Sequence, residues 1–346
     1  MPHCKTYSAN TRERARCLAP TISRKSSRLR QAGVKEEERK PISLFDIYKE
    51  FIDTVGRQNA WTKTSHYKHN SIMHLLEEFN PQIKFDDLSE DTLQDFVEFL
   101  REYKGIRNTT LNKYLHFIRQ FLLWADDKGY NTRKDYRRFS PRLKGANFEL
   151  KKVIYLTWEE LMRIYNMYIK EGTLSTVRDV FCFCCFTGLR YSDVYNLRKT
   201  DIINGKIDIV TQKDSDNIQI ELNKYSKSIL DKYEDIELKN GKALPVLSNQ
   251  KYNMHLKDLG KMAELDSEIT EVWYEGNKRI QQTFHKWERL TTHVARKTFV
   301  VNALMLGIPP QVIMRWTGHN DLKAMKPYTH IVDKLKEDEM SKFDKI

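Results

Sequence analysis

The sequence predicts a mainly α-helical protein with two domains and a small β-hairpin or sheet. Apolar residues recur at helical spacing over most of the chain, whereas alternation marks two short stretches within residues 206–222. A length of 346 residues fits two domains plus extensions. Residues 131–150 interrupt the helical pattern between two periodic regions, so we expect the linker there.

Residues 1–40 show no helical periodicity and are predicted to be a basic, flexible arm. They hold eleven Lys or Arg and four Glu, a net charge of +7 out of +12 for the chain. Such an arm either contacts a polyanion, releasing counterions, or is a solvated tail. An organellar presequence is a further alternative, which Glu13 and Glu36 to Glu38 argue against.

Residues 41–130 are predicted to form a small domain of four helices. The first can be capped by Ser43, and the third starts near Ser89. Pro81 ends the second and Gly129 the fourth. The apolar faces carry Leu44, Ile47, Tyr48, Phe51, Ile52 and Val55; Ile72, Leu75, Leu76 and Phe79; Leu93, Phe96, Val97 and Leu100; and Leu111, Tyr114, Leu115, Ile118 and Leu122.

The predicted linker, residues 131–150, is basic and contains Pro141 and Gly145. Its composition fits an ordinary solvated loop and fits equally a segment that lies along a DNA backbone.

The second domain is expected to span residues 151–346. It opens at Thr157 with a capping box to Glu160. An apolar helix over 175–186 follows, and we interpret its three cysteines as buried thiols of a reducing compartment. The alternating stretches around Lys213 predict a β-hairpin. Further helices are expected over 223–234, 249–264, 291–306 and 309–316, with an irregular stretch over 270–290 and a second hairpin around Glu275, Gly276 and Asn277.

Four separate segments carry side chains that together suit phosphodiester cleavage. Taken singly, each has an ordinary explanation: a surface arginine, a turn lysine, or a tyrosine that packs near the C-terminus. His293 and Arg296 are three residues apart and share a helix face, and His319 precedes Tyr328 by nine residues. In chain order the set is Arg190, Lys213, His293, Arg296, His319 and Tyr328.

Cleavage of a phosphodiester without a metal needs a nucleophile, charge neutralisation on the phosphate and proton transfer. Two arginines can grip the non-bridging oxygens. A donor aimed at charge that develops in the transition state can be worth about 3–4 kcal/mol. A tyrosine oxygen can form a covalent intermediate, while lysine and histidine move protons. The six residues supply all of these parts.

The order of these motifs resembles that of the tyrosine recombinases or phage integrases. That family has an arginine in a TG-x-R turn, a hairpin lysine, H-x-x-R, a GH pair and a tyrosine about nine residues later. This chain has TGLR at 187–190, Lys213, His293-x-x-Arg296, Gly318-His319 and Tyr328. The part from His293 to Tyr328 is most similar to integrases of Bacteroides-type mobile elements. The helical segment resembles the family's core-binding domain, and residues 151–346 resemble its catalytic domain.

The resemblance implies a role for each candidate residue. Arg190 and Arg296 clamp the scissile phosphate, Lys213 is the general acid, His293 moves the proton of the attacking oxygen, and His319 hydrogen-bonds the phosphate. No cofactor, metal or ATP is implied.

For Tyr328, the resemblance implies a 3′-phosphotyrosyl bond and a free 5′ hydroxyl. Attack by a second strand's 5′ hydroxyl then exchanges strands through a Holliday junction. The implied partners are double-stranded DNA and accessory DNA-bending or directionality factors. The chain is expected to be a monomer in solution and a homotetramer in the synaptic complex. No membrane partner is implied, and the expected location is cytoplasmic, on the nucleoid.

Departures from the family pattern are also visible. Lys297 stands where the family often has histidine, and Pro327 restricts the residue before it next to Tyr328. Residues 1–40 are shorter than a usual arm-binding domain. The tail, about 333–346, carries Leu335, Met340, Phe343 and Ile346, which either pack on their own domain or dock on a neighbouring subunit.

Three other classes of protein share part of this pattern. A DNA-binding regulator on the same scaffold should lack a catalytic residue, and none is missing. A relaxing topoisomerase would use similar chemistry, but the short helical N-terminal domain argues against it. A helix-turn-helix regulator explains the basic charge but leaves Tyr328 and the two arginines unexplained.

Overall fold

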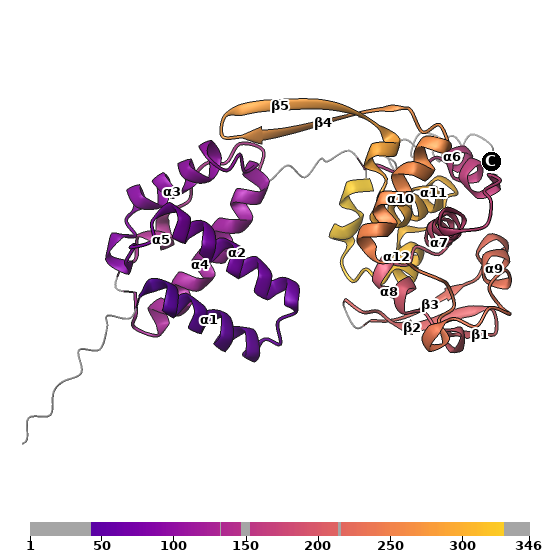
Figure 1. The fold of residues 1–346 in the computed structure, drawn as a ribbon, viewed down its shortest axis with the longest axis horizontal. Helices are drawn as coiled ribbons and strands as arrows, with labels where there is room; N and C mark the ends of the chain where they lie inside the picture. Colours follow the sequence, from indigo (N-terminus) through magenta and orange to yellow (C-terminus); the bar gives the residue numbers. More distant parts are fainter. Residues whose placement is uncertain (1–42, 132, 147–152, 214–215, 329–346) are drawn as a thin grey trace, which may run out of the picture.

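The structure is a computed structural model that describes residues 43–131, 133–146, 153–213 and 216–328. The predictions for the arm (1–40) and the tail (333–346) lie outside the described residues. Two domains stand apart in Figure 1, and a long β-hairpin extends from the second to the first. The mainly α-helical fold with small antiparallel sheets is confirmed.

The first domain contains the four predicted helices. Ser43, Thr62 and Ser89 cap three of them by accepting a hydrogen bond from the backbone N–H three residues on. Tyr48 stacks on Phe121 with ring centroids 3.9 Å apart, at the centre of an aromatic core. The elements are α1 (Leu44–Gln58), α2 (Lys63–Phe79), the 3-10 turn η1 (Phe85–Asp87), α3 (Glu90–Glu102) and α4 (Asn108–Asp127).

The stretch predicted as a linker is partly ordered against this domain. A one-turn helix, α5 (Asp135–Arg138), lies within it. Tyr136 is buried in the core of the first domain, and its hydroxyl donates to Asp126 at 2.8 Å. One buried aromatic residue therefore holds part of a basic, aperiodic stretch in place.

The second domain combines helices with two small sheets. The predicted capping box is present, since Thr157 and Glu160 bond each other's backbone N–H groups. The elements are α6 (Trp158–Asn166), α7 (Thr173–Thr187), α8 (Tyr191–Asn196), η2 (Lys199–Asp201), β1 (Ile202–Ile203), β2 (Lys206–Val210), β3 (Asn217–Glu221), α9 (Lys224–Asp231), η3 (Lys239–Gly241), α10 (Asn249–Met262), β4 (Glu268–Glu275), β5 (Lys278–His285), η4 (Lys286–Arg289), α11 (Thr292–Met305), α12 (Pro310–Thr317) and η5 (Leu322–Tyr328).

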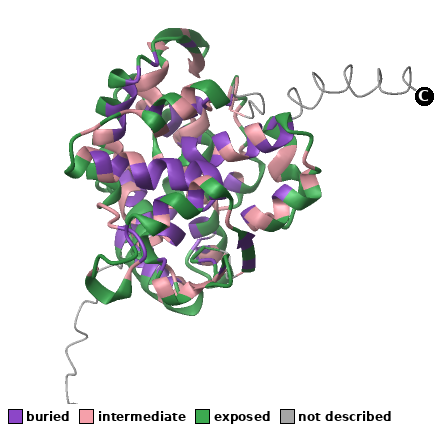
Figure 2. Cartoon of the chain, turned by 90° about the vertical axis from the view of Figure 1, so that its right-hand side faces the viewer, coloured by how far each residue is buried: buried purple, intermediate pink, exposed green. Residues whose placement is uncertain are grey.

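The apolar helix α7 runs through the core of this domain. Figure 2 shows buried residues concentrated in the middle of the domain and exposed ones at its rim. Cys182, Cys184 and Cys185 are buried free thiols, and burial raises the pKa of each. They are therefore packing residues, as predicted.

The hairpin predicted around Lys213 is formed by β2 and β3. Ile207 pairs with Ile220, and Ile209 with Ile218. Strand β1 adds a short third strand to this sheet.

The second hairpin is much more regular than the sequence suggested. β4 and β5 pair over eight residues each, from Glu268 with His285 to Glu275 with Lys278. Apolar and polar residues do not alternate clearly over residues 270–290. Most of this ribbon projects from the domain, so neither of its faces packs on a core and neither needs to be apolar. Only Ile269, at its base, is buried.

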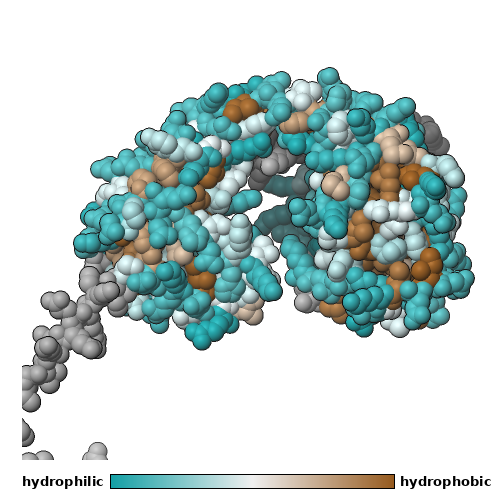
Figure 3. All heavy atoms as spheres, viewed as in Figure 1, coloured by the Kyte–Doolittle hydropathy of each residue, from teal (hydrophilic) through white to brown (hydrophobic). Residues whose placement is uncertain are grey.

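The space between the domains is open in Figure 3, is bordered mainly by hydrophilic side chains and is crossed at one end by this hairpin. Among the helices of the described residues, none combines the length and apolar character that crossing a bilayer requires.

Candidate active site

Arg190 is positioned by the end of the buried helix α7. Gly188 ends that helix in the left-handed conformation, with φ of 72°. A Cβ at this position would lie 2.5 Å from Cδ1 of Phe299 on α11, so the close approach of two helices also requires glycine. The chain then reverses, and half-buried Arg190 occupies the N-cap of α8.

Arg296 is a buried cation on α11, 4% exposed. Its guanidinium donates to the Gly188 carbonyl at 2.8 Å and also to the Thr317 carbonyl. A third contact joins its Nη2 to His319 Nε2 at 3.1 Å. These bonds tie three of the four motif segments together around one side chain.

The neighbours of His319 indicate its tautomer. Because Arg296 can only donate, Nε2 accepts in this contact. Nδ1 lies 2.8 Å from Thr317 Oγ1, and that hydroxyl donates to the Ile313 carbonyl at 2.7 Å. The network thus assigns the proton to Nδ1. To donate from Nε2 to a phosphate, His319 must gain a proton or exchange its tautomer.

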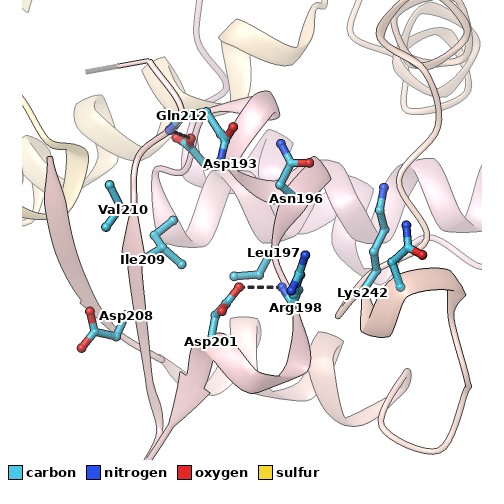
Figure 4. Close-up of a pocket in the computed structure, with 11 residues that line it drawn as sticks. Asp193, Asn196, Leu197, Arg198, Asp201, Asp208, Ile209, Val210, Gln212 and Lys242 are labelled. Carbon is cyan, nitrogen blue, oxygen red and sulfur yellow. Dashed lines mark hydrogen bonds between the residues drawn. The ribbon is translucent and has the colours of Figure 1, made fainter. Parts of the chain in front are cut away.

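The turn that carries Lys213 is held at both ends. On one side, the backbone N–H of Gln212 donates to Asp193 Oδ1 at 2.9 Å. Figure 4 shows these two residues next to each other, at the rim of a pocket of about 410 Å³. On the other side, the Asn320 amide donates to the Asp216 carboxylate at 3.1 Å. The lysine turn is therefore anchored to both the Arg190 and the His319 segments.

His293 lies in a positive environment. Desolvation of the ring lowers its pKa first, and the charges of Lys297, Arg296, Arg190 and Lys213 each lower it further. These effects require the four cations to be near the ring. The imidazole is therefore favoured in its neutral form, which can accept a proton.

Tyr328 is buried, with 8% exposure, at the end of η5. Burial raises the pKa of its phenol, while the charge of nearby Arg296 acts in the opposite direction. Its hydroxyl therefore keeps its proton near neutral pH and needs an acceptor in order to attack. The ring belongs to an apolar cluster with Val153, Val300, Val301, Ala303, Leu304 and Ile313.

The structure thus brings the six predicted residues into one region. Arg190, Lys213 and His293 are linked through electrostatic effects, and Arg296 links to His319 by a hydrogen bond and to Tyr328 through its charge.

Sequence reasoning missed the supporting residues Asp193, Thr317, Asp216 and Asn320. The position of Asp193 could have been recognised from the sequence. It lies three residues after Arg190 at the start of a helix, and residues at this spacing share one helix face. The contact between Asp216 and Asn320 joins residues 104 positions apart and left no local signal.

Two further hollows lie beside this region. A groove of about 970 Å³ runs along β3 and α12 and includes His319 and Asn320 in its wall. A mainly apolar pocket of about 390 Å³ is lined by residues that include Trp158, Phe186, Tyr225, Phe299 and Trp316.

Comparisons with known proteins identify the class. A phage integrase SAM-like domain matches residues 43–142, and the phage integrase family matches residues 155–334. A tyrosine recombinase of Thermosipho africanus is 22% identical over 307 residues, which cover 86% of this chain and 99% of the relative. Tyrosine recombinase XerA of Saccharolobus solfataricus is 24% identical over 236 residues, covering 67% of this chain and 66% of that protein.

Solved structures share the fold. A lambda integrase dimer bound to a COC′ core site has a TM-score of 0.64 at 15% identity, covering 82% of this chain and 95% of that one. The Tn1549 transposon integrase in complex with transposon right end DNA has a TM-score of 0.61 at 15% identity, covering 82% and 93%. A lambda integrase tetramer bound to a Holliday junction has a TM-score of 0.63 at 14% identity, covering 84% and 83%.

These matches define a tyrosine-type site-specific recombinase with two domains. Because the second family match alone spans more than half of the 346 residues, the chain belongs to the phage integrase family.

Proposed function

We propose that the chain cleaves and rejoins double-stranded DNA at a specific site, with Tyr328 as the nucleophile. The observation that carries this proposal is the convergence of residues from four separate segments around Arg296 and His293. Two arginines, a lysine, two histidines and a tyrosine match the needs of a metal-free phosphoryl transfer.

In the proposed cleavage step, Tyr328 Oη attacks the phosphorus and its proton passes to neutral His293. The bond from phosphorus to the 5′ oxygen breaks, and Lys213 supplies the proton that makes this oxygen a hydroxyl. Arg190 and Arg296 stabilise the negative charge that grows on the phosphoryl oxygens. Tyr328 is only 8% exposed, so most of its side chain is covered by the protein before DNA binds.

Strand exchange reverses this step. The 3′-phosphotyrosyl bond conserves the energy of the phosphodiester, so a 5′ hydroxyl of a second strand can displace Tyr328 and form a Holliday junction. The reaction then needs neither ATP nor a metal ion. The lambda integrase tetramer on such a junction has the same fold and supports this assignment.

A nicked DNA substrate tests the chemistry, because loss of a short 5′ fragment traps the covalent intermediate. We expect wild-type protein to form a 3′-phosphotyrosyl adduct without ATP and in the presence of EDTA, and Tyr328→Phe to form none. An adduct with Tyr328→Phe, or no adduct on the mapped recombination site, refutes the assignment. Relaxation of any supercoiled DNA without a defined site would favour a topoisomerase instead.

A homotetramer is proposed for the synaptic complex, with each tail reaching a neighbouring copy. The apolar pocket lined by Trp158, Phe186 and Phe299 would receive the apolar residues of segment 333–346. Removing residues 333–346 should leave binding to a single site intact and weaken assembly on paired sites. An unchanged assembly in native gels would contradict docking between copies.

Two further proposals concern the domain boundaries and the cellular location. Residues 41–130 and 151–346 are the two DNA-binding units, and 131–150 connect them. The substrate implies action in the cytoplasm on the nucleoid, as the integrase of a mobile element.

A further inference from the structure

The β4–β5 hairpin crosses between the two domains as a narrow two-stranded ribbon (Figure 1). The eight paired residues of each strand are separated by seven steps of roughly 3.4 Å, so the ribbon is about 24 Å long. A lone two-stranded ribbon is marginally stable in water, so contacts at its two ends have to hold it in place.

The tip of the hairpin is bound by one side chain of the first domain, that of Asn108 at the start of α4. Asn108 is 1% exposed. Its amide nitrogen donates to the Gly276 carbonyl at 2.8 Å, and its Oδ1 accepts from the Gly276 N–H at 3.0 Å. The same nitrogen donates to the Lys144 carbonyl at 2.9 Å. One buried amide therefore joins the hairpin turn, helix α4 and the stretch after α5.

Aromatic contacts reinforce this junction. The Arg107 guanidinium lies 3.7 Å from the ring centroid of Trp273, and Lys144 Nζ lies 5.1 Å from that of Tyr274. Gly145 passes so close to Tyr274 that a Cβ would lie 2.5 Å from its ring carbon Cδ2.

The base of the hairpin is fixed to the second domain. Lys286 Nζ lies 2.7 Å and 2.8 Å from the two Glu160 carboxylate oxygens, and both side chains are largely buried. Arg289 pairs with Glu271 at 3.1 Å and covers the Phe284 ring at 3.4 Å. With both ends fixed, the ribbon can act as a strut.

We propose that Asn108 is a positioning residue that locks this strut and so presets the spacing of the two domains across the opening in Figure 3. Two binding surfaces held at the right distance lose less conformational freedom when they engage one ligand. This inference rests on the proposed binding of one DNA duplex by both domains. It assigns the strut a role in DNA affinity and none in the chemical step.

The spacing is tested without DNA, by spin labels at Asp53→Cys on α1 and Lys227→Cys on α9, both exposed. Cys4 and Cys17 are replaced by Ser in this background, and the buried cysteines remain. We expect Asn108→Ala to broaden the distance distribution. Asn112→Ala, an exposed residue one turn further on α4, should leave it unchanged. Equal distributions in wild type and Asn108→Ala overturn the proposal, and do so whether or not Tyr328 forms an adduct.

DNA binding provides the second readout. Asn108→Ala should weaken affinity about tenfold or more, as expected when unbound domains move freely. The cleavage rate of saturated DNA should stay within about threefold of wild type, and the slope of affinity against salt should not change. A slope that falls by about 0.9 or more would mean a lost phosphate contact and would contradict the strut.

A second pair of variants, at two glycines, tests the strut independently of how Asn108→Ala affects folding. Gly145→Ala and Gly105→Ala both place a side chain at a positive φ, of 69° and 56°, but only the first meets Tyr274. We expect the first to broaden the distances and weaken DNA binding, and the second to do neither. Equal effects of the two substitutions would refute the strut.

Discussion

At the scale of single residues, the buried guanidinium of Arg296 is held in place by three hydrogen bonds. A buried guanidinium needs hydrogen-bond partners, and here the Gly188 and Thr317 carbonyls and His319 provide them. These three bonds fix the orientation of the guanidinium within the site. After desolvation and the charge of Lys297, the charge of Arg296 is a further cause that lowers the pKa of His293.

The acid side of the pH profile should report His293. Its pKa is lowered below its ordinary value of about 6.5, so the neutral, proton-accepting form dominates above that pH and is lost as pH falls through the lowered pKa. The cleavage rate at DNA concentrations below Kd, which reflects the free protein, should therefore fall only below about pH 6.5.

His293→Gln should cleave DNA more slowly at every pH, and its rate should no longer fall at acid pH through the titration of this histidine. An acid limb that persists in His293→Gln, or that begins above the ordinary histidine pKa, would assign the titration to another group.

Lys213 can be tested through its leaving group. Lys213→Ala should slow cleavage of ordinary DNA by about 10²–10⁴-fold, the usual contribution of a general acid. Substituting sulfur for the 5′ bridging oxygen creates a leaving group that needs no proton, so the same variant should cleave that DNA at close to the wild-type rate. Single-turnover rates on the two substrates check this, and a defect of equal size on both would exclude the acid role.

At the scale of elements, the site depends on where helices and strands end. The turn after α7 places Arg190, the end of the β2 strand places Lys213, and the end of α12 places His319. Gly188 and Gly318 both adopt left-handed conformations at these helix ends, which is why TG-x-R and GH carry glycine.

Gly188→Ala should destabilise the protein more than Gly205→Ala. Both positions have a positive φ, of 72° and 73°, which costs an alanine roughly 1–2 kcal/mol. Only at Gly188 does the added Cβ also clash with Phe299, which adds about 1–3 kcal/mol. Urea unfolding measures the difference, and equal losses would mean that Phe299 yields without cost.

Gly188→Ala should also slow DNA cleavage, because relief of the clash with Phe299 would shift the turn whose carbonyl accepts from Arg296. An unchanged cleavage rate in a folded variant would show that the clash with Phe299 is relieved without moving the Gly188 carbonyl away from Arg296.

At the scale of the whole molecule, two domains, each with its own buried core, lie on either side of a hydrophilic opening that the β4–β5 hairpin crosses (Figure 3). The chain carries a net charge of +12, of which residues 1–40 contribute +7. The salt dependence of DNA binding therefore reports how much of the contact involves the arm.

Deleting residues 1–40 should weaken DNA binding at low salt and reduce the slope of log affinity against log salt by at least about 2.7, equal to about three phosphate contacts. A full-length chain with the eleven arm cations changed to Gln should behave in the same way. An unchanged slope in either variant would mean that the arm is a solvated tail.

The sequence alone determined the mainly helical fold, the helix caps at Ser43 and Thr157, the Lys213 hairpin and the order of the six candidate residues. These features depend on local periodicity, capping and short motifs, which neighbouring residues encode. Only the tertiary structure decided that Asp193 and Asn320 hold the lysine turn, that Tyr328 is buried, and that Asn108 binds the tip of a long polar hairpin. Those contacts join segments up to 168 positions apart, so packing sets them and no local pattern records them.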